Sequence, residues 1–141
     1  MPWKPDDNEH DDSNVRTDAK VQVTKEISEW DYGDYEGLTS KYIAEQRQKE
    51  GKGSWDIWRD GCPGGESPTQ ITERLDDLIR EIRERFHGPA IGKAKGDTGP
   101  CDVLIVAHGH ILRAFAARWV GRSIANNPSL ILEAGGVGTL R

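Results

Sequence analysis

The sequence predicts an α/β fold, and two patterns carry this prediction. Residues 103–107, VLIVA, form a continuous apolar run, which is typical of a strand buried on both faces of a parallel or mixed sheet. Apolar residues at helical spacing follow at 110–120, and a last strand pair is expected at 130–133 and 137–140 around a Gly-Gly turn. Strand, helix and strand thus alternate, which is the order of elements in α/β proteins.

Length and composition limit the class of protein. The 141 residues allow one domain, and 35% hydrophobic with 30% charged residues allow a modest core. The net charge of -5 favours neither nucleic acid nor an anionic membrane as a partner. The longest apolar run is too short to cross a bilayer, and the first residues lack the apolar core of a secretion signal. We therefore expect a cytoplasmic protein with reduced cysteines that binds neither nucleic acid nor membrane.

The first third of the chain is expected to be only partly regular. Residues 1–19 are rich in aspartate without apolar periodicity, which predicts an acidic tail or a long loop. Residues 20–27 alternate in part and favour a short strand. A short helix should begin at a cap formed by Thr39 or Ser40 and run through Lys49.

The strongest local signal is a long amphipathic helix. Ser67, Pro68 and Gln70 form a capping box with proline at the first helical position. Gly88 and Pro89 stop the helix. Between these signals, spacings of three and four lay one apolar stripe along about five turns. The stripe consists of Ile71, Leu75, Leu78, Ile82 and Phe86.

His108 and Gly109 stand where the predicted buried strand meets the next helix, which is where ligands bind in open α/β sheets. A helix start offers unpaired N–H groups to an anion such as phosphate, and Gly109 allows close approach of the backbone. His108 can donate to a phosphoryl oxygen or transfer a proton near neutral pH. Alternatively, its ring only caps the helix or satisfies a core carbonyl.

His110 and Arg113 are further candidates at this junction. His108 and His110 form a His-x-His pair, but zinc needs three or four ligands and no other Cys or His falls at a typical spacing, so we expect no metal. Arg113, one turn into the helix, either reaches an anion held at the helix start or lies solvated on the surface.

Two acidic residues lie in candidate loops. Glu29 opens EWDYGDYEG, and burial beside Trp30 would favour the protonated form that a catalytic acid needs. The alternative is a polar loop whose aromatic residues cover the sheet edge. Glu66 in GCPGGES either contributes to a site or only precedes the helix that Ser67 caps.

Several segments follow one another in an order typical of one family. They are EWDYGDYEGLT, IWRDGCPGGES, the long helix, VLIVAHGHILRAFAARW and NPSLILEAGGVGTL. This set resembles the histidine phosphatase superfamily, also called phosphoglycerate mutase-like, and most closely its fungal sedoheptulose-1,7-bisphosphatase-like branch. The resemblance covers about residues 20–141, and it rests on the ordered set rather than on one motif. It implies a three-layer fold in which helices flank a mostly parallel sheet.

The resemblance also implies a mechanism with two histidines and an acid. One histidine attacks phosphorus and becomes phosphohistidine, a second histidine and two arginines bind the phosphoryl oxygens, and a carboxylic acid protonates the leaving oxygen. By their place in the motifs, His108 matches the second histidine and Glu29 matches the acid. Glu66 matches a position near the phosphate pocket. His110 and Arg113 match the branch-typical extension of the second-histidine motif.

The sequence departs from this family at its opening motif. Arg-His-Gly, whose histidine is the nucleophile, does not occur, and neither His10 nor Arg16 has the surroundings of the missing residues. In the family, the strand that matches 102–107 lies between the two strands that are absent here. Buried unpaired backbone groups cost about 1–3 kcal/mol each, against a net stability of about 5–15 kcal/mol. We expect an N-terminally truncated domain over 20–141, without its first central strand, that is poorly stable as a monomer, has a rearranged sheet, or self-associates through exposed strand edges.

The sequence therefore predicts a phosphatase-family member acting on a sugar phosphate or bisphosphate, in a chain that lacks the nucleophile and is inactive by itself. The alternative is an inactive remnant or interaction protein that keeps part of a phosphate-binding pocket. In both cases the expected ligand is a phosphorylated small molecule or inorganic phosphate. No cofactor is expected.

Overall fold

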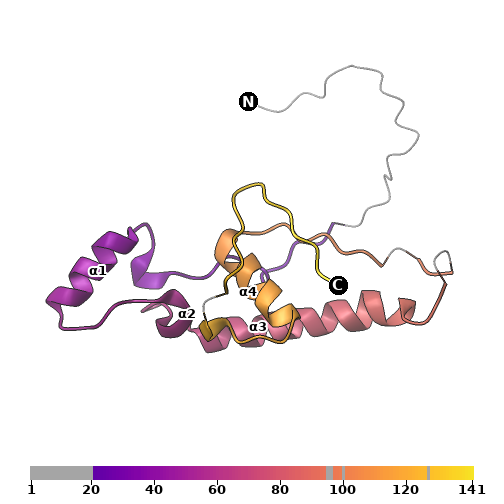
Figure 1. The fold of residues 1–141 in the computed structure, drawn as a ribbon, viewed down its shortest axis with the longest axis horizontal. Helices are drawn as coiled ribbons and strands as arrows, with labels where there is room; N and C mark the ends of the chain where they lie inside the picture. Colours follow the sequence, from indigo (N-terminus) through magenta and orange to yellow (C-terminus); the bar gives the residue numbers. More distant parts are fainter. Residues whose placement is uncertain (1–20, 95–96, 100, 127) are drawn as a thin grey trace, which may run out of the picture.

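The computed structural model of the chain describes residues 21–94, 97–99, 101–126 and 128–141. The tail predicted for residues 1–19 lies outside these ranges. Within them no strand is assigned, and the regular structure is helical (Figure 1). In chain order the elements are η1 (Gly33–Tyr35), α1 (Ser40–Lys49), α2 (Ile57–Asp60), α3 (Pro68–Ile82), the π-helical η2 (Arg83–His87), η3 (Gly88–Ala90), α4 (Gly109–Trp119) and η4 (Ile124–Asn126).

The long helix α3 begins as the sequence predicts. Ser67 Oγ accepts the Gln70 backbone N–H at 3.3 Å, and the Gln70 side chain accepts the Ser67 N–H at 2.9 Å, so the capping box is confirmed. The apolar stripe is buried over the length of α3, with Ile79 added to it. Beyond α3 the backbone widens into η2, so the predicted five turns are divided between an α-helix and a π-helical turn.

Helix α4 lies on α3, and the core forms between them (Figure 1). Its position agrees with the predicted helix to within one residue at each end. The helical spacing in the sequence predicts an inner face made of Ile111, Leu112, Phe115, Ala116 and Trp119. The buried face is rotated from this one, because Ala114 and Ala117 are buried while Leu112 and Ala116 are only partly buried. Burial of a large aliphatic side chain contributes about 1.5–3 kcal/mol, so the α3–α4 contact contributes strongly to stability. Its most buried large aliphatic residues are Ile71, Leu75 and Ile111.

Helix α1 also begins where the sequence predicts. Thr39 Oγ1 accepts the Tyr42 N–H at 3.2 Å, and Gly51 follows the helix with a φ of 69° that favours glycine. The helix projects from one end of the molecule, away from α4 (Figure 1), and buries only Ile43.

Two loops that are far apart in the sequence interlock. In EWDYGDYEG and GCPGGES, the Asp34 N–H donates to the Pro63 carbonyl at 2.8 Å and the Glu66 N–H donates to the Asp31 carbonyl at 3.0 Å. The backbones approach so closely that a Cβ atom at Gly65 would collide with the Asp31 carbonyl oxygen. Gly64 and Gly65 therefore serve this contact, which the sequence alone did not predict.

Aromatic and imidazole rings hold the start of α4 against the first of these loops. The Tyr32 hydroxyl and His110 Nδ1 are hydrogen-bonded at 2.8 Å, and the Trp58 ring lies 5.5 Å from the His110 ring. Burial and the nearby Glu29 carboxylate raise the pKa of Tyr32 well above 10. Burial also lowers the pKa of His110 below 6.5, although the Glu29 charge opposes this shift. At neutral pH both rings are therefore uncharged.

The segment predicted as the central strand is not buried on both faces. Ile105 and Ala107 pack against the core, but Leu104 and Val106 are 84% and 83% exposed, so that part of the prediction is wrong. The physical reason is that no second layer covers the outer side of this segment in the described chain. The predicted turn of the last strand pair is present, because the Gly136 N–H donates to the Glu133 carbonyl at 2.8 Å.

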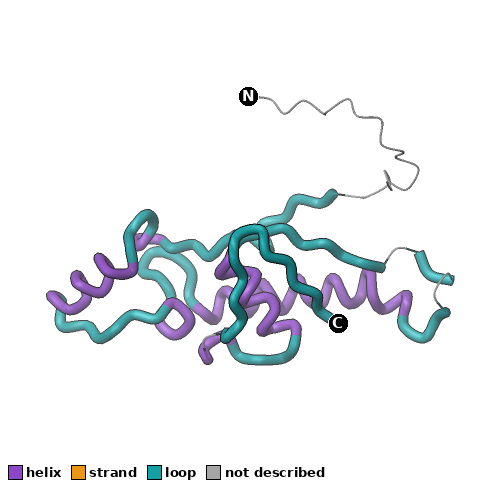
Figure 2. The backbone as a smooth tube through the Cα atoms, turned by 45° about the horizontal axis from the view of Figure 1, so that its top comes forward, coloured by secondary structure: helices purple, strands orange, loops and turns teal. Residues whose placement is uncertain are grey.

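Three extended segments carry most of the exposed aliphatic side chains. Figures 1 and 2 show these segments, 21–28, 101–107 and 128–141, gathered on one side of α3 and α4. We call their exposed aliphatic residues the extended face, which consists of Val21, Val23, Val103, Leu104, Val106, Leu130, Ile131, Val137 and Leu140. The helices thus form one covered layer, and the α/β fold class with its parallel sheet stays a prediction.

The loop interlock makes glycine essential at position 65. We expect Gly65→Ala to lower the free energy of unfolding by about 1–3 kcal/mol, because the added methyl group pushes the two loops apart. Gly53→Ala is the matched control, since a Cβ atom there meets nothing within 4 Å and the change should stay within about 0.5 kcal/mol. Urea unfolding followed by tryptophan fluorescence measures both. Equal stabilities of the two variants would contradict the interlock.

The environment of His110 predicts a pH dependence of stability. Because its folded pKa is below the unfolded value of 6.5, the unfolded chain takes up a proton first as pH falls. The stability should therefore decrease from pH 7 downward through this range, and His110→Gln should remove that part of the decrease. Urea unfolding at pH 5, 6, 7 and 8 measures it, with His87→Gln accounting for the loss of a histidine elsewhere. Parallel pH curves for the wild type and His110→Gln would be the contrary result.

Candidate functional site

The Glu29 carboxylate lies on the N-terminus of α4. Its Oε1 accepts the Ile111 N–H at 2.9 Å and its Oε2 accepts the His110 N–H at 3.3 Å, while the Trp30 N–H donates to Oε1 at 2.9 Å. A negative charge is favourable here, because the helix dipole is positive at this end and the first N–H groups have no partner within the helix. The anion expected at this helix start is therefore supplied, in this structure, by the chain itself.

His108 stands at the same helix start. It is the N-cap residue of α4 with extended backbone, and its side chain is exposed and makes no capping hydrogen bond. Neither of the two structural alternatives, a cap or a partner for a core carbonyl, describes this ring. A Cβ atom on Gly109 would meet nothing within 4 Å, so the space above the first turn is open. Glu29 thus lies on the helix start whose N-cap residue is His108, and the roles assigned to them, an acid and a phosphate-binding histidine, stay predictions.

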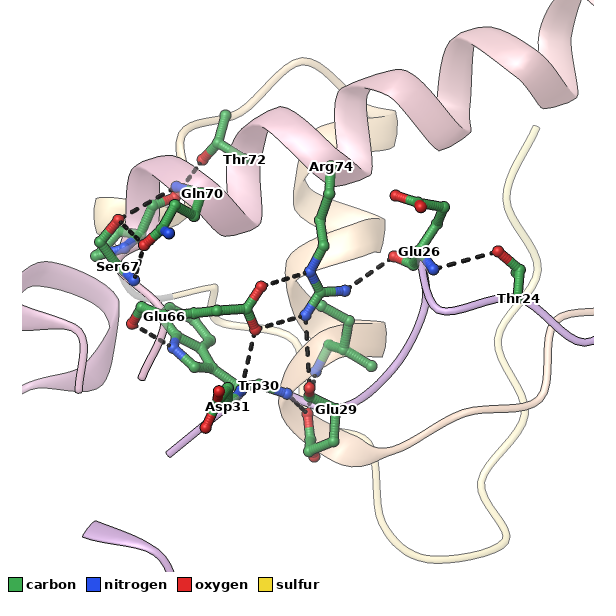
Figure 3. A network of polar contacts seen from close by, with 12 residues as sticks. Thr24, Glu26, Glu29, Trp30, Asp31, Glu66, Ser67, Gln70, Thr72 and Arg74 are labelled. Carbon is green, nitrogen blue, oxygen red and sulfur yellow. Dashed lines mark hydrogen bonds and ion pairs between the residues drawn. The ribbon is translucent and has the colours of Figure 1, made fainter. Parts of the chain in front are cut away.

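Glu66 belongs to an ion pair that lies beside Glu29 (Figure 3). Arg74 donates through Nε and Nη2 to the two Glu66 oxygens at 2.7 and 2.8 Å, and the Asp31 N–H donates to Oε2 at 3.0 Å. Burial would raise the pKa of Glu66, but the hydrogen bonds from Arg74 and Asp31 outweigh it and lower the pKa below 4.5. The carboxylate is thus charged at neutral pH, and both of its oxygens are engaged.

Arg74 ties three segments together and was not predicted as a site residue. Besides Glu66, it donates to the backbone carbonyls of Glu26 at 2.8 Å and Glu29 at 3.5 Å (Figure 3). It therefore positions the residue that caps α4. The only sequence signal for it is its place between Ile71 and Leu75, beside the buried stripe, where a half-buried charge needs a partner.

The remaining predicted residues point elsewhere. The ring of His110 is held by Tyr32, as described above. The Arg113 guanidinium donates to the carbonyls of Leu130 at 2.7 Å and Pro128 at 2.8 Å, and it lies 5.0 Å from the Trp58 ring centre. Arg113 thus holds the C-terminal segment against the helix. The phosphate-binding roles assigned to His110, Arg113 and Glu66 stay predictions.

Other sites are few in the described chain. Among the described residues, no group of three or more His, Cys, Asp or Glu is placed to hold a metal ion. A surface cavity of about 660 Å³ lies between α3 and the end of α4, where Arg80, Arg83 and Arg118 are among its lining residues, and none of the predicted site residues borders it. Throughout the described ranges, no helix has the length and apolar character needed to span a membrane.

Comparison with known proteins places these features in one family. The family model described as histidine phosphatase superfamily (branch 1) matches residues 13–141. Sedoheptulose 1,7-bisphosphatase of Saccharomyces cerevisiae is 32% identical over 89% of this chain and 57% of its own length. Acid phosphatase of Mycobacterium tuberculosis is 35% identical over 83% of the chain and 49% of its own length. Glucosyl-3-phosphoglycerate phosphatase of the same organism is 31% identical over 87% of the chain and 52% of its own length.

A solved structure agrees with these relatives. The open reading frame Rv3214 of Mycobacterium tuberculosis matches with a TM-score of 0.60 and 36% identity, over 77% of this chain and 47% of that one. The chain therefore spans about half the length of the relatives it matches. The resemblance seen in the ordered motifs is confirmed, and the chain belongs to the histidine phosphatase superfamily.

Proposed function

We propose that this chain carries the proton donor and one phosphoryl-binding histidine of a phosphomonoesterase, and that the nucleophile comes from outside these 141 residues. The observation that carries the proposal is the contact of the Glu29 carboxylate with the first N–H groups of α4, the helix that His108 begins. An acid, an exposed imidazole and a helix start then meet at one point, which suits a phosphoryl group with a leaving oxygen beside it.

The proposed substrate class is a sugar phosphate or bisphosphate. It is supported by two relatives whose names specify phosphorylated sugar derivatives, sedoheptulose 1,7-bisphosphatase and glucosyl-3-phosphoglycerate phosphatase. In the reaction, a histidine nitrogen attacks phosphorus, the bond from phosphorus to the sugar oxygen breaks, and that oxygen takes a proton from Glu29. Water then gives a proton back to Glu29 as it attacks the phosphohistidine, and the breaking of the phosphorus–nitrogen bond releases inorganic phosphate and restores the free imidazole.

No nucleophile for this reaction is evident among the described residues. His87 stacks against Trp119, with ring centres 5.6 Å apart, and the His110 ring is held by Tyr32. Burial raises the pKa of the Cys62 thiol to about 11, so it is protonated at neutral pH. His10 lies outside the described residues, and its sequence context does not match the family's Arg-His-Gly motif. The proposed activity of the chain by itself is therefore phosphate binding without turnover.

In this proposal Glu29 caps α4 in the free protein and acts as the proton donor when substrate is bound, and it cannot do both at once. As a carboxylate it occupies the α4 N–H groups, and a bound phosphoryl group needs the same donors. When phosphate takes these donors, the Glu29 side chain leaves them and becomes available beside the leaving oxygen. The ion pair of Glu66 with Arg74 keeps the backbone of this segment in place during the exchange.

A test of turnover separates the two functional classes. With p-nitrophenyl phosphate, we expect the purified chain to show no hydrolysis above buffer and no phosphohistidine by mass spectrometry, because an attacking histidine is missing. The same assay on His108→Ala, with His87→Ala as the matched histidine control, identifies any residual activity. Hydrolysis that disappears in His108→Ala alone would mean that the chain contains its own nucleophile.

A binding test examines the competition at the helix start. Glu29→Gln should bind inorganic phosphate about three- to tenfold more tightly than the wild type, because the competing charge is removed. Glu26→Gln is the control, since it makes the same charge change three residues away and the contacts of Glu26 in the described chain go through its backbone. Calorimetric titration at constant ionic strength measures the affinities. Equal affinities for the two variants, or no phosphate binding by any of them, would contradict the proposed site.

A further inference from the structure

The extended face is unusual for a free monomer. Val23, Ile131 and Val137 are 95%, 88% and 88% exposed, in addition to Leu104 and Val106. These residues belong to three segments that lie on one side of the helical layer (Figures 1 and 2). Large exposed apolar areas on soluble proteins mark interaction sites.

Residues 103–107 form the second part of the argument, because their backbone groups lack partners within the described part of the chain. Among the hydrogen bonds between described residues, none involves a backbone group of residues 103–107. The sequence of this segment, VLIVA, has high strand propensity and no proline. An extended, apolar and unpaired segment of this kind is a template for pairing with another strand.

The size of the extended face matches what a dimer needs. It has nine aliphatic side chains. Burying a fully exposed side chain of this kind removes on the order of 60–120 Å² of apolar surface from water. Because the nine side chains are between 38% and 95% exposed, the total is roughly 400–800 Å², which approaches the ~800 Å² per partner of a stable protein interface.

The charge distribution permits a second copy as the partner. Although the chain has a net charge of -5, residues 103–107 and 134–140 contain no charged side chain. Two copies can therefore meet there without placing like charges opposite each other. A segment that pairs with itself about a twofold axis runs antiparallel to its copy, and one surface serves both partners.

We propose that two copies of this chain associate through their extended faces, with residues 103–107 of each copy forming an antiparallel strand pair. This pairing satisfies backbone groups that have no partner among the described residues, and it covers Leu104 and Val106. The proposal does not depend on phosphate binding, because no residue of the extended face belongs to the site at Glu29 and His108.

Val106→Lys tests this interface directly. The side chain is 83% exposed, so lysine is tolerated in the monomer but introduces like charges in the dimer. We expect sedimentation equilibrium of the full chain to show a dimer at micromolar concentration, and the dissociation constant to rise at least about tenfold in Val106→Lys. Ile91→Lys is the matched control, because Ile91 is 80% exposed, β-branched and outside the extended face. It should leave the dimer unchanged.

Amide hydrogen exchange tests the strand pair itself. In the wild type, alternate amides within 103–107 should become protected as the protein concentration rises, because an edge strand directs every second N–H to its partner. In Val106→Lys these amides should exchange rapidly at all concentrations, while circular dichroism shows that the helices persist. The proposal would be overturned by a wild type that stays monomeric well above micromolar concentration. It would equally be overturned by an equal rise of the dissociation constant in Ile91→Lys, or by amide exchange in residues 103–107 that does not depend on protein concentration.

Discussion

The burial of one apolar stripe on α3 is the interaction on which the rest of the structure depends. Ile71 and Leu75 have no exposed surface, and they contact a core to which α4, α2 and η4 contribute. The same helix presents Arg74 at the edge of the stripe, where it pairs with Glu66 and reaches the backbone of Glu26 and Glu29. Packing on one face of α3 and charge pairing at its edge therefore place the candidate site.

The site follows from how the two loops meet α4. The interlocked glycine-rich and acidic loops fix the position of the segment that carries Glu29. The hydrogen bond of Tyr32 with His110 fixes the start of α4 against that segment. As a result, a carboxylate occupies the N–H groups that a phosphoryl group would use, and an exposed imidazole stands beside it. This arrangement stabilises the fold without a ligand, because an unpaired helix start would otherwise be left next to the core.

The two sides of the molecule differ in how completely helix ends are capped and apolar side chains are covered. On the helical side, the helices have side-chain caps at Thr39, Asp56 and Ser67, and large side chains are buried. On the other side, residues 103–107 keep an apolar sequence that suits a covered strand, but Leu104 and Val106 face solvent. The relatives are about twice as long as the region they share with this chain.

The sequence by itself determined the local elements and the family. The caps at Thr39 and Ser67, the stripe of α3 and the extent of α4 were predictable, because caps and stripes depend on residues three or four positions apart. The family was predictable because the motifs keep their order. Only the tertiary structure decided that Glu29 caps α4, that Glu66 pairs with Arg74, that Arg113 binds backbone carbonyls and that the 103–107 segment is half exposed. The three contacts join segments that are remote in the chain, and the exposure of 103–107 depends on which segments lie beside it. Both therefore follow from tertiary packing, which no local sequence pattern encodes.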